Sequence, residues 1–114
     1  QVFNYIPTFV ATNSTEALTN TSTAVSVSTA ISTVDSSGGA VTVTLAAGVT
    51  GQLKTIICTT AGNNITVTPA ATVGSGTTVV LDAAGESVQL LYTGTAWAAV
   101  ATSSFATNIA TVIQ

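Results

Sequence analysis

The chain has 114 residues, a formal net charge of −3 and only 4% charged residues, far below the roughly 25% of an ordinary soluble domain. A chain of this length forms one domain that can bury a core without a disulfide or a structural metal. Because Lys54 is its one basic residue and it has no His, we expect no nucleic-acid partner and no histidine-based catalytic or zinc site.

Residues 1–22 are predicted to form an N-terminal arm and a linker. The segment "QVFNYIPTFVA" gathers large apolar side chains around Pro7, which favours an extended backbone for the residue before it. The next segment, "TNSTEALTNTSTA", is polar and is expected to be a linker with at most one turn of helix, capped by Asn13 or Ser14. The apolar side chains of the arm need cover, either from the chain's own core or from a neighbouring subunit.

Residues 23–101 are predicted to form an all-β domain. Ala40 to Leu45 alternates apolar and hydroxyl side chains without a break, and Ala24 to Val34 does so with one slip; both patterns are typical of half-buried strands. The segments "QLKTIICTT" and "NITVTP" are expected to form a hairpin across "AGNN", and "TTVVLD" follows them. The segments "ESVQLLYT" and "TAWAAVAT" are expected to be antiparallel neighbours. About seven or eight short strands of this kind predict an antiparallel β-sandwich or barrel.

Residues 102–114 are predicted to be a C-terminal tail with an apolar stripe whose spacing fits an amphipathic helix. Its Thr and Ile content disfavours an isolated helix, so helix and strand both stay open. Each terminus either folds back on the core or packs against a neighbouring subunit. We predict that both termini pack against a neighbouring subunit. The expected partner-binding residues are Phe3, Tyr5, Ile6 and Phe9 of the arm and Phe105, Ile109, Val112 and Ile113 of the tail.

Few side chains could carry chemistry. Cys58 has no His to act as a base, so we expect a buried structural thiol. Asp82 and Glu86 flank the turn "AAG" and are expected to cap backbone N–H groups or face solvent; a Ca²⁺ site or a glycosidase-like pair is the less favoured alternative. We therefore predict no catalytic residue, no metal site and no cofactor.

Two further residues have specific predicted environments. Lys54 is expected to pair with a carboxylate or to lie at a subunit boundary, and otherwise to be a solvated strand residue. Trp97 is expected to be buried near Tyr92, because the one Trp of a charge-poor domain should anchor its last hairpin. The alternative for Trp97 is an exposed platform for stacking a sugar. No apolar run is long enough for a membrane-spanning helix.

The segment Gly38 to Val100 resembles a β-rich module of structural proteins of tailed phages, particularly those of marine bacteria and cyanobacteria. The matching features are "LAAGVTGQLKTI", "NNITVTPA" and "VLDAAGESVQLLYTGTAW". In such proteins the module occurs in head decoration proteins, head fibres and tail fibres, typically as trimers. The resemblance implies a virion component. It does not reach the two terminal segments.

We therefore expect a non-enzymatic capsid decoration or cement protein, a homotrimer on the outer capsid surface that binds the major capsid protein through its apolar termini. A surface of hydroxyl groups suits a particle that persists outside cells, because salt does not perturb it. Two alternatives stay open. One is a tail-fibre or head-fibre adhesin module that binds host glycans, and the other is an extracellular filament subunit assembled by strand addition.

Overall fold

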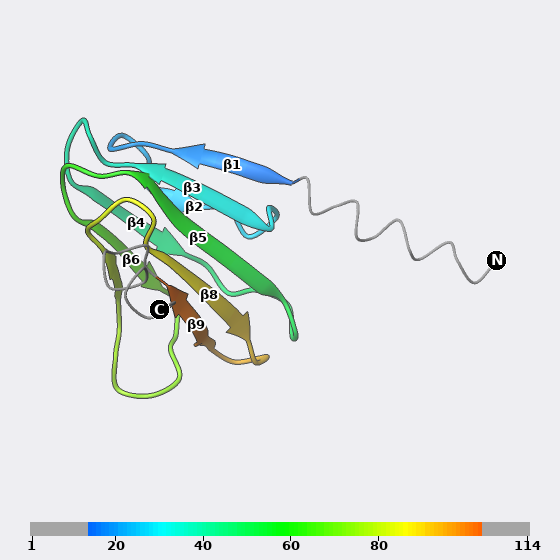
Figure 1. Ribbon diagram of the computed structural model, residues 1–114. Coiled ribbons are helices and arrows are strands. Elements are labelled where there is room, and N and C mark those ends of the chain that lie inside the picture. Colours follow the sequence, from blue (N-terminus) through cyan, green and yellow to red (C-terminus); the bar gives the residue numbers. More distant parts are fainter. Residues whose placement is uncertain (1–13, 104–114) are drawn as a thin grey trace, which may run out of the picture.

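β-Branched and hydroxyl side chains give strands and loops throughout the part of the chain that the computed structural model describes, residues 14–103 (Figure 1). Residues 1–13 and 104–114 lie outside this description. The described strands are β1 (Thr15–Leu18), β2 (Ala24–Val25), β3 (Ile31–Asp35), β4 (Val41–Leu45), β5 (Leu53–Thr60), β6 (Ile65–Pro69), β7 (Val79–Leu81), β8 (Ser87–Tyr92) and β9 (Trp97–Ser103).

The strands form two sheets (Figure 1). Sheet A has the order β1-β3-β5-β8-β9, and sheet B has the order β2-β4-β6-β7. Through the first six strands the chain changes sheet after every strand, so β1, β3 and β5 are parallel in sheet A and β2, β4 and β6 are parallel in sheet B. The remaining strands add antiparallel pairs, β7 to β6, β8 to β5 and β9 to β8.

The predicted antiparallel sandwich or barrel is therefore wrong, although the described chain is all-β. The sheets are mixed and do not close into a barrel. The predicted hairpin across "AGNN" is also wrong, because β5 lies in sheet A and β6 in sheet B. Residues 61–64 carry the chain from one sheet to the other. The alternation of side chains along β5 and β6 is the same whether the connection between them is a crossing or a hairpin turn, so the sequence pattern could not distinguish the two.

Two other segments differ from the prediction. Ala24 to Val34 is not one strand, because it contains β2 of sheet B and β3 of sheet A. The predicted polar linker contains β1, which pairs with β3 in the register Thr15 to Ile31, so the turn of helix expected there is wrong. The last hairpin is confirmed: β8 and β9 are antiparallel neighbours, with Tyr92 opposite Trp97.

The core lies between the inner faces of the two sheets. Alternation along β4 places Val41, Val43 and Leu45 at 0% exposure and leaves the Thr residues between them outside. On β5 the same alternation buries Lys54, Ile56 and Cys58. The buried position expected for Cys58 is confirmed. Among the described residues no helix is long and apolar enough to cross a membrane.

Trp97 closes one end of this core. It is 1% exposed, and its ring meets that of Tyr92 edge to face, with 5.1 Å between ring centroids. The indole Nε1–H donates to the carbonyl oxygen of Ala46 at 2.9 Å, so the polar atom of this large side chain is satisfied. The predicted burial of Trp97 beside Tyr92 is confirmed, and the exposed sugar-stacking platform is wrong.

Candidate interaction surfaces

The most heavily buried charged group is Lys54, on the inner face of β5 at 0% exposure. Its Nζ donates to the carbonyl oxygen of Thr29 at 2.9 Å and to Thr29 Oγ1 at 2.7 Å. Glu16 Oε1, on β1, lies 3.9 Å from the same nitrogen. Burial lowers the pKa of Lys54 from its ordinary value, and the negative charge of Glu16 partly opposes that shift. The expected pairing of Lys54 with a carboxylate is confirmed.

Glu16 is also the centre of a small hydrogen-bond network. Its Oε1 accepts from the backbone N–H of Ser26 at 2.7 Å and from Ser32 Oγ at 2.6 Å. These bonds tie the edge strand β1 to β3 and to the connection that follows β2. Because a buried charge is costly unless it is paired, this fixed carboxylate helps to explain how Lys54 is tolerated inside the core. Its role is to hold β1 in place.

Asp82 and Glu86 lie close together at the turn before β8, as predicted. Glu86 Oε1 accepts from the backbone N–H groups of Asp82 at 2.6 Å and Ala83 at 3.1 Å, which is the capping role expected for this carboxylate. The hydrogen bond from the Asp82 backbone lowers the pKa of Glu86, whereas the side-chain hydrogen bond to Glu86 raises the pKa of Asp82. Among residues 14–103, no three acidic, Cys or His side chains are grouped to hold a metal ion.

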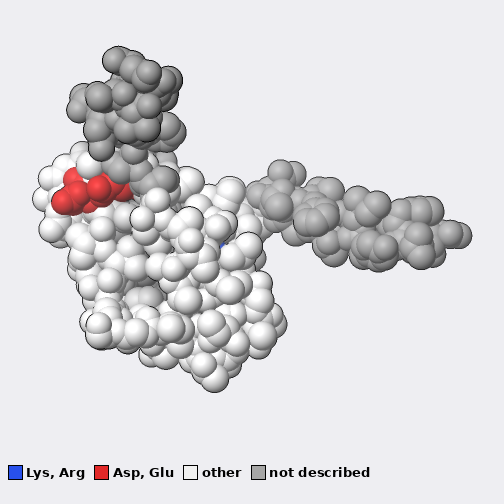
Figure 2. Space-filling model, turned by 60° about the horizontal axis from the view of Figure 1, so that its bottom comes forward, with Lys and Arg blue, Asp and Glu red and all other residues white. Residues whose placement is uncertain are grey.

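Three of the four acidic side chains, Asp35, Asp82 and Glu86, lie near one end of sheet A, whereas Glu16 lies beside Lys54. Burial is the largest cause of the raised pKa of the Cys58 thiol, and the charges of Glu86, Asp35 and Asp82 add to it. Figure 2 shows acidic atoms gathered in one place on the face that it presents, with almost only uncharged atoms elsewhere on that face. Most of the acidic side chains are therefore gathered at this end of the sheet.

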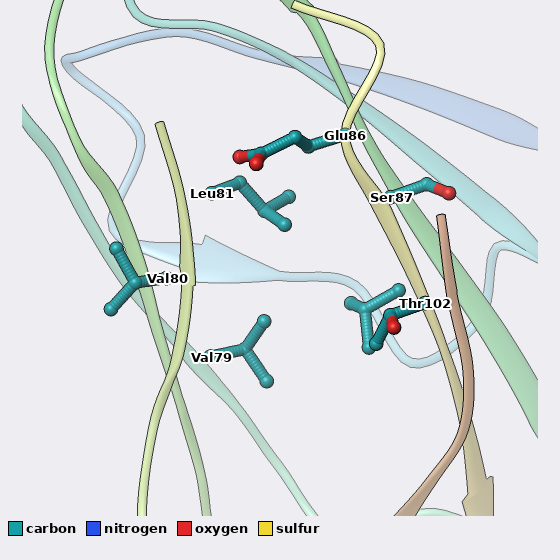
Figure 3. Close-up of a pocket in the computed structure, with 7 residues that line it drawn as sticks. Val79, Val80, Leu81, Glu86, Ser87 and Thr102 are labelled. Carbon is teal, nitrogen blue, oxygen red and sulfur yellow. The ribbon is translucent and has the colours of Figure 1, made fainter. Parts of the chain in front are cut away.

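A groove lies between the edge strands β7 and β9. It has two hollows that share Val79, with cavity volumes of about 310 Å³ and 150 Å³. Figure 3 shows Val79 and Leu81 pointing toward β8 and β9, while Val80 points away. The hollows are lined mostly by apolar side chains of both sheets, with Glu86, Ser87 and Thr102 at one end. We call this feature the β7 groove.

The β7 groove was missed by the sequence reasoning. The sequence predicts a strand that contains Val79 to Leu81, but it does not predict that this strand lies at the edge of a sheet. The eight predicted partner-binding residues, Phe3, Tyr5, Ile6, Phe9, Phe105, Ile109, Val112 and Ile113, all lie outside the described residues. Their predicted role in binding a partner therefore stays a prediction.

Comparison with known proteins finds no relative: no family model, no curated protein and no solved structure matches this chain. The class that can be stated is a small all-β domain of two mixed sheets, whose first six strands alternate between layers. The resemblance to a phage structural module rests on the sequence features quoted for it.

Proposed function

We propose that this chain is a non-enzymatic structural protein of a virus particle, a capsid decoration protein that forms a homotrimer on the outer surface of the capsid. The resemblance of residues 38–100 to the phage module supports the location. Attachment to the major capsid protein is assigned to the arm, residues 1–11, with Phe3, Tyr5, Ile6 and Phe9 as its apolar contacts.

The observation that carries the proposal is the position of β1. This strand is an edge of sheet A, and among residues 14–103 it pairs only with β3. Ser14, directly before it, accepts a backbone hydrogen bond from Ala30 at 3.0 Å. The arm therefore joins the fold at a sheet edge. Such an edge offers backbone groups to a partner, and an apolar segment beside it can add side-chain contacts.

The charge distribution supports attachment through apolar and backbone contacts. Lys54 is the chain's one basic residue and is 0% exposed, so the protein has no basic side chain on its surface with which to pair an acidic partner. Contacts made by large apolar side chains and by strand addition are insensitive to salt, unlike surface ion pairs. A particle exposed to changing salt keeps such contacts.

The two alternative functions differ in what supports them. A filament subunit gains support from the several sheet edges, because strand addition between copies needs an edge to receive the arm of the next copy. A glycan-binding adhesin is less well supported, because Trp97 is 1% exposed and Tyr92 is 8% exposed, so neither ring is available to stack on a sugar. The filament is therefore the second candidate.

Deletion of residues 1–11 tests the proposal. The shortened chain is compared with the full chain in thermal melting, in analytical ultracentrifugation and in binding to particles assembled without the protein. We expect attachment to fail while melting stays unchanged. Loss of self-association without loss of particle binding would favour the filament, and a large fall in melting temperature would show that the arm belongs to its own core.

Point substitutions sharpen this experiment. Phe9→Asp should weaken particle binding strongly, because it places a charge where an apolar side chain is expected to be buried. Thr8→Asp is the matched control, since it adds the same charge to the same segment at a residue outside the predicted set. Equal effects of the two substitutions would mean that the arm acts through its charge or its length, which would contradict the proposed apolar contact.

A further inference from the structure

The inner face of sheet A is covered as far as β8 and at Trp97 of β9, and it is open on the rest of β9. Leu90 and Val88 on β8 are 2% and 1% exposed. Their partners across the strand pair, Ala99 and Thr102 on β9, are both exposed. Side chains opposite each other in an antiparallel pair point to the same side of the sheet. The exposure of Ala99 and Thr102 is therefore not on the outer surface but on the face that elsewhere forms the core.

The sheet orders explain this exposure. Sheet A has five strands and sheet B has four, and β7 and β9 are the last described strands on the same side. The segment before β7 covers the Trp97 end of β9, where Trp97 N–H donates to Ala71 and Val73 N–H donates to Trp97. Toward Thr102 the β7 groove continues along the open edge of β7. The groove has the position that a fifth strand of sheet B would occupy.

We propose that the β7 groove is a strand-acceptor site and that residues 109–113 of the same chain bind there as the fifth strand of sheet B. The length of the connection supports this occupant. The chain crosses from sheet A to sheet B through residues 19–23, 36–40 and 61–64, which are four or five residues each time. After β9 ends at Ser103, a crossing of five residues brings Ile109 to the first position of a strand.

The direction of the chain supports the same assignment. Ser103 pairs with Ser87, and Ser87 pairs with Ile57 near the end of β5. The chain therefore leaves β9 at the end of sheet A from which β5 crosses to β6. Because β9 runs parallel to β5, a strand entered by the same crossing runs parallel to β6 and antiparallel to β7. Antiparallel addition to β7 needs no further turn.

The side-chain pattern of the segment fits a half-buried strand. In "IATVI", Ile109, Thr111 and Ile113 share one side of a strand, and Ala110 and Val112 share the other. Turning the two Ile residues inward places the larger apolar groups against the floor of the groove. An amphipathic helix would instead put Ile109 and Val112 on one face. The strand assignment thus gives Val112 an outward position, and it assigns the tail to the chain's own core, the alternative left open by the sequence.

Hydrogen exchange of the segment Val79–Leu81 in the full chain tests the proposal. Ile109→Asp should release the added strand and raise the exchange rate of β7 by about tenfold or more, because its outer edge loses its partner. Val112→Asp is the matched control and should leave that rate within about a factor of two of the unchanged chain. Equal acceleration by both substitutions would indicate a docked helix, and no acceleration by Ile109→Asp would show that the groove is not occupied by this segment. Either result overturns the proposal.

A chain that ends at Ser103 provides a second measurement. Its β7 should exchange as fast as in the Ile109→Asp variant, and addition of a synthetic peptide of residues 104–114 should restore protection. If protection of β7 in the full chain disappears on dilution, the bound segment comes from another copy, which overturns the assignment to the same chain. If the shortened chain does not fold, the comparison of Ile109→Asp with Val112→Asp still tests whether residues 109–113 occupy the β7 groove as a strand.

Discussion

Lys54 Nζ and Glu16 Oε1 lie 3.9 Å apart, and the pair joins the central strand β5 to the edge strand β1 across the inner face of sheet A. The Lys54 side chain is 0% exposed and that of Glu16 is 22% exposed. Water therefore reaches one partner and not the other. The pair holds the strand from which the N-terminal arm extends, so its loss should affect both stability and the geometry of attachment.

Lys54→Met should lower the free energy of unfolding by about 1–3 kcal/mol, because it removes the positive charge beside Glu16 and the buried donor to two acceptor atoms of Thr29. Urea denaturation measures this change. The double variant with Glu16→Gln is the control: if the pair acts as a unit, the double variant loses less than the sum of the single losses. Strict additivity would contradict coupling between the two side chains.

Lys54 should make stability rise with pH in the alkaline range just below its ordinary pKa of 10.5. Burial lowers the pKa of Lys54 below 10.5, so between the lowered value and 10.5 the unfolded chain binds more protons than the folded chain. Raising the pH in that window therefore favours folding. Above 9.0 the raised pKa of Cys58 opposes this gain, because the folded chain then holds a proton that the unfolded chain releases. Melting temperature against pH, with Lys54→Met as the variant that should lose the rise, measures both effects.

Glu86→Gln should destabilise the turn before β8 and reduce the loss of stability in acid. The pKa of Glu86 is lowered from 4.5, mainly by the hydrogen bond from the Asp82 backbone. Its contribution is present above 4.5 and is lost as the pH falls through the lowered value. The raised pKa of Asp82 acts in the opposite sense from its ordinary value of 3.8 upward. A Glu86→Gln variant with an unchanged acid melting profile would contradict this role.

Trp97→Ala should cost about 3–5 kcal/mol of stability, because it removes a fully buried aromatic ring. Trp97→Phe should cost less, since it keeps a ring near Tyr92 but leaves the carbonyl oxygen of Ala46 without the indole donor. Denaturation curves give both values, and native Trp fluorescence should shift to longer wavelength on unfolding. A native spectrum typical of water-exposed Trp would contradict the buried position.

Gly48→Ala should destabilise the protein by about 1–3 kcal/mol, because the added methyl group would lie 2.8 Å from Trp97 Cζ2 and 2.6 Å from Gln52 Oε1. Gly76→Ala is a matched control, since a methyl group added there meets nothing within 4 Å. The two melting temperatures compare the same change at a crowded and an open position. Equal temperatures would mean that the Trp97 ring can move aside at little cost.

The environments of Lys54 and Trp97 could be predicted because each residue is the one of its type in the chain. One Lys in an almost uncharged chain must find a carboxylate or water, and one Trp in a Thr-rich and Val-rich chain has more apolar surface to bury than its neighbours. These arguments placed Lys54 beside a carboxylate and Trp97 beside Tyr92. The β7 groove could not be predicted in this way, because Val79, Ala99 and Thr102 are ordinary strand residues whose exposure depends on which strand lies opposite.

The sequence by itself determined that the domain is all-β, which residues of β4 face inward, and that the last two strands form a hairpin, because side-chain alternation and short turns are local properties. Only the tertiary structure decided that β5 and β6 lie in different sheets and that β1 is a strand. A side-chain period of two is identical for parallel and antiparallel pairing, and whether a connection of four or five residues turns back or crosses about 10 Å to a second layer depends on the strands already packed there.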